Sequence, residues 1–235
     1  MLTMLHERKL GTIVGPIVLR DTRGTQDLRC FVWRGPLDGA GDGVAVVEHD
    51  AACMLLVEKH NVFERLRMDG FAQERRCVVL CGNGYLGRSF HRLVHRIHEQ
   101  LQVPLYVLAD NDPAGYEFFF HVARGSASAR GRPQSATAIP IAAFLGLRVR
   151  DFELLGLSDH VGIDLSDPER SQIRRLMSCP WLRSDAAWQQ ELDGLMQRGF
   201  KVELEALCTI SLSHMASSYL PDRLDASDHL LNPTR

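Results

Sequence analysis

The sequence predicts an α/β protein with a mainly parallel sheet flanked by helices. Two observations carry this prediction. Short apolar runs alternate with amphipathic segments through the middle of the chain, and one of these segments has the apolar spacing of a helix. The 235 residues, 45% of them hydrophobic, are enough to bury one large core or two modest ones. The chain is therefore expected to be globular.

The alternation defines a predicted core over residues 50–160. "ACMLLVE" leads into an amphipathic segment at 61–69, "CVVLCG" leads into 88–101, and "PLYVLAD" leads into 114–123. This order is the signature of βαβ units and of a parallel sheet. Five apolar residues of the second segment recur at helical spacing, namely Phe90, Leu93, Val94, Ile97 and Leu101. We expect a helix over 88–101.

Two further parts flank this core. Residues 1–49 form a β-rich lead-in, in which two β-rich runs within 10–34 are separated by a polar, glycine-containing turn, and this pattern predicts a hairpin. The pattern becomes helical in residues 161–235, with helices expected over 167–178, 185–198 and 201–219. The predicted organisation therefore has three parts.

Composition narrows the class of protein. The chain has no apolar run of 18 residues, and its first residues lack the apolar stretch of a signal peptide. We therefore expect no membrane span and an intracellular location. The six cysteines form no CxxC pair, and several lie in apolar runs such as "CVVLC". This favours reduced core residues over a zinc site or a disulfide framework.

The net charge of −2 conceals an uneven distribution. Residues 1–150 carry 19 basic and 15 acidic groups (+4), which leaves 8 and 14 (−6) for residues 151–235. The first part is therefore the better candidate for binding an anion. The predicted helix at 88–101 has a basic face, which either meets phosphate or is simply solvated. That face carries Arg88, His91, Arg92, His95, Arg96 and His98.

Three acidic residues follow two of the predicted strands. Glu58 ends "CMLLVE", and Asp110 and Asp112 follow "PLYVLA". The carboxyl ends of parallel strands meet at one edge of a sheet, so these acids are expected to lie together. Pro113 favours an extended Asp112, which turns Asp110 and Asp112 to the same side and Asn111 away.

Such a cluster of carboxylates predicts a cation site. Three close carboxylates repel one another unless a cation neutralises them, and oxygen ligands suit Mg²⁺ or Mn²⁺. The simpler alternative is that these acids only cap the helices that follow them. A second possible metal site, formed by His91 and His95 at helical spacing, is disfavoured.

A strand ending in Glu followed by a strand ending in DxD resembles the Toprim domain of topoisomerases, primases and certain nucleases. Longer blocks resemble the family of the topoisomerase VI A subunit, which includes the meiotic protein that makes double-strand breaks in DNA. The blocks occur in family order over about residues 10–224. They are "LLVEKHNVFERLRMDGF" (55–71), "DNDPAG" (110–115), "RGSAS" (124–128), "FLGL" (144–147) and "CPWLRSDAAWQQELDGLMQRGFKVELEALC" (179–208) through "YLPDRL" (219–224).

The resemblance implies a Toprim fold, a Rossmann-like sheet flanked by helices, and a role in type IIB cleavage of double-stranded DNA. Carried across by motif, Glu58, Asp110 and Asp112 are the metal ligands for Mg²⁺ or Mn²⁺, and Glu58 is also a candidate acid or base. The DNA-binding candidates are Arg88, Arg92, Arg96 and Arg124.

The resemblance also implies partners and a location. In this family two A-type subunits cut the two strands, so we expect a homodimer or an A-type partner. A B-type ATPase subunit is a further candidate. The expected location is the nucleus or chromosome in a eukaryote and the cytoplasm otherwise.

Departures from the family pattern leave other functions open. The family's nucleophilic tyrosine lies on a winged-helix domain before the Toprim domain, and no tyrosine precedes Glu58 here. We therefore expect the nucleophile to come from a domain absent from this chain. The family's Gly-Lys-Gly is replaced by Gly82-Asn83-Gly84, and Tyr85 beside it is expected to stack or pack. The alternatives are a hydrolytic Toprim nuclease and a non-catalytic DNA-binding or dimerisation subunit.

Overall fold

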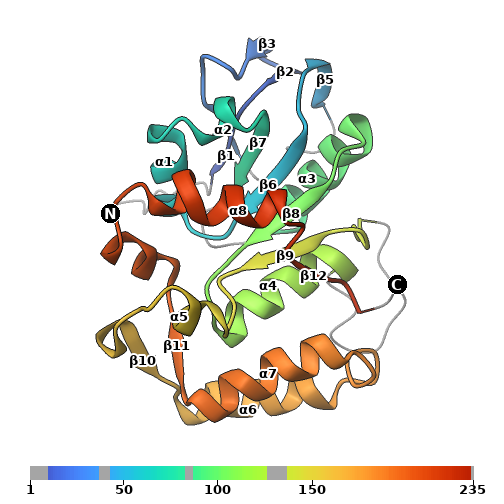
Figure 1. The fold of residues 1–235 in the computed structure, drawn as a ribbon. Coiled ribbons are helices and arrows are strands. Elements are labelled where there is room, and N and C mark those ends of the chain that lie inside the picture. Colours follow the sequence, from blue (N-terminus) through green and yellow to red (C-terminus); the bar gives the residue numbers. More distant parts are fainter. Residues whose placement is uncertain (1–9, 37–42, 83–86, 126–136, 234–235) are drawn as a thin grey trace, which may run out of the picture.

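A seven-stranded sheet with four parallel strands at its centre organises the molecule (Figure 1). The computed structural model describes residues 10–36, 43–82, 87–125 and 137–233. The strand order is β12-β9-β8-β6-β7-β1-β4. The parallel strands are β6 (Cys53–Val57), β7 (Cys77–Cys81), β8 (Leu105–Leu108) and β9 (Ala143–Gly146). Antiparallel strands flank them: β1 (Leu10–Val14), β4 (Trp33–Pro36) and β12 (Leu230–Leu231).

Helices cover both faces of this sheet, as the alternating pattern predicts. All five residues of β6 and of β7 are buried, which is typical of strands enclosed between two layers. Successive side chains point to opposite faces, so Leu56 and Leu80 belong to one core and Leu55 and Val79 to the other. The parallel sheet flanked by helices is confirmed.

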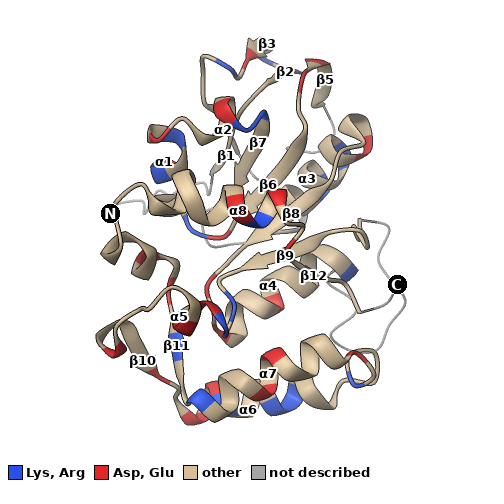
Figure 2. Ribbon diagram, in the orientation of Figure 1, with Lys and Arg blue, Asp and Glu red and all other residues tan. Residues whose placement is uncertain are grey.

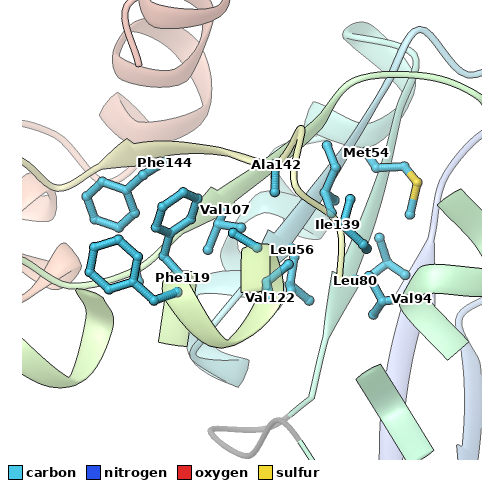
Figure 3. Packing of buried hydrophobic residues seen from close by; sticks show 14 of the residues in the cluster. Met54, Leu56, Leu80, Val94, Val107, Phe119, Val122, Ile139, Ala142 and Phe144 are labelled. Carbon is cyan, nitrogen blue, oxygen red and sulfur yellow. The ribbon is translucent and has the colours of Figure 1, made fainter. Parts of the chain in front are cut away.

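The first core lies between the sheet and helices α3 (Arg88–Leu101), α4 (Pro113–Arg124), α6 (Asp167–Ser178) and α7 (Ala186–Arg198). Figure 3 shows part of it, with Phe119 and Phe144 beside Val107 of the sheet. The ring of Trp188 stacks on that of Phe119 with centroids 5.3 Å apart. Aromatic side chains of this size supply much of the burial free energy of a core. The helix predicted over 88–101 is confirmed, and all five apolar residues are buried.

The second core lies on the other face. It is covered by α1 (His60–Met68), α2 (Phe71–Glu74) and α8 (Leu220–Asp225), together with a 3₁₀ segment at Leu204–Thr209 and a π-helical turn at Met215–Tyr219. Phe63 and Leu66 of α1 are fully buried there. The short helix α5 (Asp151–Leu154) follows β9, and a 3₁₀ turn at Asp159–Val161 comes after it.

The predicted N-terminal hairpin is present but is bent between two sheets. At the open end of the hairpin, β1 pairs with β4 in the main sheet. Near its turn, β2 (Ile17–Asp21) pairs with β3 (Gly24–Asp27), and both belong to a separate sheet with β5 (Ala45–His49). The bend falls at Gly15, where φ is +139° and a Cβ would lie 2.5 Å from the Cys77 carbonyl oxygen. Only glycine fits both constraints without strain.

The C-terminal part confirms two of its three predicted helices. Helix α6 has the predicted bounds, set by a capping box between Ser166 and Glu169, and α7 begins one residue after its predicted start. The helix predicted over 201–219 is wrong. Strand β11 (Phe200–Val202) pairs there with β10 (Gly162–Asp164), and the 3₁₀ and π-helical segments follow. The boundaries of the three predicted parts stay a prediction.

The cysteines are reduced, but only half of them are core residues. Cys53, Cys77 and Cys81 are buried in the sheet, whereas Cys179 and Cys208 are partly buried and Cys30 is exposed. The interpretation as core residues is therefore right for the three strand cysteines and wrong for Cys30. Within the described ranges, none of the helices has both the length and the apolar character needed to cross a membrane.

Candidate metal centre

Glu58 and Asp110 follow two neighbouring parallel strands, β6 and β8. The backbone N–H of Glu58 donates to the Leu108 carbonyl over 3.1 Å, which continues the β6–β8 pairing past the end of β6. Both residues therefore lie at the carboxyl edge of the sheet, where ligands gather in open α/β folds.

Asp112 caps helix α4. Its backbone is extended, with φ −149° and ψ 168°, as the following proline predicts. Its Oδ1 accepts a hydrogen bond from the backbone N–H of Gly115 over 2.6 Å. The capping alternative is therefore right for this oxygen. Because the cap uses Oδ1 alone, it leaves Oδ2 to another partner.

Gly115 allows this cap to form close to the strand end. A Cβ at this position would lie 2.4 Å from the backbone oxygen of Asp110, which is closer than any real contact. The first turn of α4 therefore approaches the Asp110 backbone only because residue 115 has no side chain. The sequence "DNDPAG" thus specifies both the acids and the close turn that carries them.

Asp110 is almost fully buried, at 5% exposure, and both of its carboxylate oxygens have partners. Oδ1 accepts from the backbone N–H of Leu204 over 2.8 Å, and Oδ2 lies 2.7 Å from Nζ of Lys59. Leu204 follows β11, so a segment almost a hundred residues later in the chain holds this carboxylate in place.

Asn111 points away from the two acids, as the i, i+2 argument predicts, and is fully buried. Its Nδ2 donates to the Tyr116 hydroxyl over 2.6 Å and to Glu191 Oε1 over 3.3 Å. Arg198 donates to its Oδ1, and its backbone bridges Val202 of β11. The acidic loop is therefore fixed to α4, α7 and β11 by a residue that does not face the site.

Glu58 is the most perturbed acid of the site. Burial, together with the charges of Asp110 and Asp112, raises its pKa to about 7, although a hydrogen bond from the Asp110 backbone opposes the shift. Its Oε2 is buried and has no hydrogen-bond partner among the described residues. A buried carboxylate oxygen without a partner is costly and is a position that a cation would satisfy.

The two aspartates share this environment. Burial raises the pKa of Asp110 to about 6, although the bond from Lys59 and the Leu204 N–H oppose the shift. Burial also raises the pKa of Asp112, against the Gly115 N–H and the charge of Lys201. A cluster of acids with perturbed pKa values in one place is a candidate functional site.

Lys59 is the site residue that the sequence analysis missed. Besides Asp110, its Nζ lies 2.9 Å from Glu205 Oε2 and 3.3 Å from Glu203 Oε2. Although burial lowers the pKa of this ammonium, the hydrogen bonds to Asp110 and Glu205 raise it above its usual value. The only signal in the sequence was its place directly after Glu58 at a strand end.

A second lysine lies beside Asp112. Nζ of Lys201 lies 2.7 Å from Glu169 Oε1, and this bond and the Ser166 hydroxyl lower the pKa of Glu169 to about 2. Figure 2 shows the charged residues of the loops after β6 and β8 on the same side of the molecule as β11. Acidic and basic groups therefore lie together at this edge.

The three candidate ligands are near one another but not converged. Among the residues that the structure describes, no three His, Cys, Asp or Glu side chains are arranged to hold a metal ion. The contacts above give the reason, since Lys59 occupies Oδ2 of Asp110 and Gly115 occupies Oδ1 of Asp112. The donor set and the unpartnered Glu58 Oε2 nevertheless fit a hard divalent ion.

The predicted DNA-binding arginines differ in exposure. Arg92 is exposed on α3 and Arg96 is half-buried, whereas Arg88 begins this helix and its side chain lies outside the described part. Arg124 is only 9% exposed, and its guanidinium packs 4.2 Å from the ring centroid of Trp181. DNA binding by all four stays a prediction, and Arg124 presents the least surface of the three whose side chains are described.

The tyrosines that the structure describes are not placed as nucleophiles. Tyr116 and Tyr219 are buried, with their hydroxyls bonded to Glu191 and Asp151 respectively. Tyr106 lies within strand β8. Tyr85 and the Asn83-Gly84 pair lie outside the described residues.

A parallel sheet with Glu at the end of one strand and DxD at the end of its neighbour defines the class of Toprim domains. The family model for the Toprim domain of Spo11 and the topoisomerase 6 A subunit matches residues 53–224. The chain belongs to this family, and the resemblance seen in the sequence is confirmed.

Individual relatives agree with the family assignment. The meiotic recombination protein SPO11-1 of Oryza sativa subsp. indica is 31% identical over 195 residues, which cover 83% of this chain and 50% of that protein. The A subunit of type 2 DNA topoisomerase 6 from Aeropyrum pernix is 25% identical over 235 residues, covering 96% of this chain and 60% of that protein. The corresponding protein of Haloarcula marismortui is 28% identical over 228 residues, covering 94% and 61%. The chain thus spans between half and about three fifths of these relatives.

Proposed function

We propose that this chain is the metal-binding and DNA-binding Toprim portion of a protein that cleaves both strands of DNA. Glu58, Asp110 and Asp112 would hold Mg²⁺, with Mn²⁺ as the alternative ion. When bound, this ion would stabilise negative charge on the transferring phosphoryl group and on its leaving oxygen. The buried, unpartnered Oε2 of Glu58 beside two further acids carries the proposal.

The protein supplies the placement of the charges. Asp112 is fixed by the cap of α4 and Asp110 by the Leu204 N–H, so one oxygen of each acid is already held in place before an ion binds. The pKa of Glu58, about 7, lies where this group can hold or release a proton at neutral pH, which suits a general acid or base. Metal binding and action as a base both require the ionised carboxylate, whereas action as an acid requires the protonated form.

The nucleophile, the DNA contacts and the partner subunits are proposed from the family resemblance. The attacking tyrosine would come from a winged-helix domain, since Tyr116 and Tyr219 are buried in this fold. The exposed Arg92 and the neighbouring Arg96 and Arg88 would hold the DNA backbone. A second A-type protomer and a B-type ATPase would complete the assembly, and its place would be the chromosome.

Titration calorimetry with MgCl₂ tests the metal site. Glu58→Gln, Asp110→Asn and Asp112→Asn should each weaken Mg²⁺ binding at least tenfold, because each removes one anionic ligand. Glu169→Gln is the matched control, since this acid pairs with Lys201 near the site and is not a proposed ligand. Wild-type affinity in all three ligand variants would contradict the assignment.

The DNA product separates cleavage through tyrosine from the alternatives. Joined to a winged-helix domain with its tyrosine, the protein should form a denaturant-stable adduct with supercoiled plasmid in Mg²⁺. Free 5′-phosphate or 3′-hydroxyl ends without an adduct would identify a hydrolytic nuclease. Metal-independent binding without cleavage would identify a protein that only binds DNA.

A further inference from the structure

We propose that Lys59 is a built-in counter-cation that holds the metal site closed and must leave Asp110 before a divalent ion can bind. This inference rests on the metal site proposed above and concerns its regulation. Lys59 acts through Asp110, so it is a positioning residue and not a catalytic one.

The contacts of Lys59 place it where an ion would go. Its Nζ lies 2.7 Å from Asp110 Oδ2, while Oδ1 of the same carboxylate is held by the Leu204 N–H. Asp110 therefore has no carboxylate oxygen left without a partner. An ion bound by Asp110 must take Oδ2 from the ammonium.

The ammonium has other partners at hand. Nζ also lies 2.9 Å from Glu205 Oε2 and 3.3 Å from Glu203 Oε2. The other oxygen of Glu205 accepts from Nδ2 of Asn61 over 2.5 Å, so this carboxylate is held beside the lysine. Lys59 can thus give up Asp110 and keep ion pairs with both glutamates through a small movement of its flexible stem.

Lys59 and a divalent ion can replace one another because both neutralise the same cluster of acids. Without an ion, Lys59 neutralises part of a cluster in which Glu58, Asp110 and Asp112 are joined by Glu203 and Glu205. With a divalent ion bound to Asp110, the ammonium becomes a like charge close to it, and the two repel each other. Movement towards the two glutamates relieves only part of this repulsion.

The proposal makes two predictions of opposite sign for Lys59→Met, which keeps most of the apolar stem and removes the charge. The metal-free protein should melt at a lower temperature at pH 7.5, because the acids lose their counter-cation. Mg²⁺ should bind at least about tenfold more tightly, because the competitor is gone. A residue that merely supported the fold would weaken both properties.

Calorimetry with MgCl₂ and thermal melting with and without the ion give these two readouts. Lys59→Arg keeps the charge, so its affinity should stay within about threefold of wild type. Lys201→Met is the matched control. It removes a lysine that pairs with Glu169 and interacts with Asp112 through its charge. Its affinity should change less than that of Lys59→Met.

Glu205→Gln tests where the ammonium goes. This variant should weaken Mg²⁺ binding severalfold in the wild-type background, because Lys59 then has a poorer alternative to Asp110. The same substitution should have little effect in Lys59→Met. Equal effects in both backgrounds would show that Glu205 acts independently of the lysine.

Two outcomes would overturn the proposal in distinguishable ways. If wild type binds Mg²⁺ through Glu58 and Asp110 but Lys59→Met binds no more tightly, Lys59 is not a competitor and only this inference fails. If wild type, Lys59→Met and Lys59→Arg all fail to bind Mg²⁺, the metal site itself is wrong and the inference fails with it. Binding by Lys59→Met alone would support it strongly.

Discussion

The amide nitrogen of Asn111 lies 2.6 Å from the hydroxyl oxygen of Tyr116, and the same hydroxyl donates to Glu191 over 2.9 Å. These three buried residues connect the acidic loop to helices α4 and α7. The loop that carries Asp110 and Asp112 is therefore positioned from behind, through the one residue between them that faces the core.

Removing this hydroxyl should weaken both the fold and the metal site. In Tyr116→Phe the carboxylate of Glu191 loses a buried donor, which costs about 1–3 kcal/mol in the free energy of unfolding. Because the loop loses support, Mg²⁺ affinity should fall severalfold. Urea unfolding and calorimetry measure the two effects. Tyr106→Phe, in a partly buried strand residue, is the control and should leave Mg²⁺ affinity unchanged.

Mg²⁺ binding should strengthen as pH rises from 5.5 to 8. Glu58, with a pKa of about 7, and Asp110, with a pKa of about 6, must both be ionised to act as ligands. Below these values each bound proton costs up to about tenfold in affinity per pH unit. Titrations in buffers of different ionisation enthalpy would count the protons released. An affinity independent of pH would exclude both acids as ligands.

The metal-free protein should show the opposite trend with pH. The folded-state pKa of Glu58 lies above its ordinary value of 4.5, so this group stabilises the fold below pH 4.5 and loses that contribution as pH rises through about 7. The loss is on the order of 3 kcal/mol. Chelator-treated Glu58→Gln should lack this slope and should unfold less readily than wild type at pH 8. Denaturant unfolding across this range would test it, and a wild-type slope in the variant would contradict it.

Gly115→Ala should distort the acidic loop. Its new Cβ would lie 2.4 Å from the Asp110 backbone oxygen, so α4 must shift and the Asp112 cap must weaken. We expect a loss of about 1–3 kcal/mol in unfolding free energy and weaker Mg²⁺ binding. Gly194→Ala in α7 is the matched control, because its Cβ would meet only the Val149 side chain, at 3.1 Å. Equal stability of the two variants would refute the close-approach argument.

DNA binding should be weak, independent of sequence and strongly reduced by salt, because phosphate contacts release counterions. Reversal of Arg88, Arg92 and Arg96 to Glu should abolish it. Reversal of Arg174 and Arg175, which are exposed on α6, is the control and should have a smaller effect. Fluorescence anisotropy across a salt series would measure both. Affinity unchanged by salt and by the triple reversal would show that the basic face of α3 is only solvated.

Local patterns predicted much of this fold because they specify local structure. The bounds of α3 and α6 agree with the apolar spacing and, for α6, with the Ser166–Glu169 capping box. The failure over 201–219 has a physical cause. The backbone of Val202 bridges Asn111, and the Leu204 N–H bonds to Asp110, so tertiary partners replace helical ones.

The candidate site also has parts that local sequence patterns specify and parts that only tertiary contacts specify. The acids could be found in the sequence because each follows an apolar strand run. The role of Lys59 could not, because its partners Glu203 and Glu205 lie about 145 residues later in the chain and are brought to it only by the return of β11. Charge pairing across such a separation leaves no periodic signal.

The return of β11 to the acidic loop has a consequence for dissecting the molecule. Leu204 and Arg198 supply donors to Asp110 and Asn111, and Val202 pairs with the loop backbone. A fragment limited to residues 50–160 would keep every proposed ligand and lose the groups that hold them. Its carboxylates would be left with unmatched charge and a loop free to move. The proposed ion affinity would therefore depend on a folding unit that is complete only when the later segment is present, and limited proteolysis near β11 should abolish it without removing a ligand.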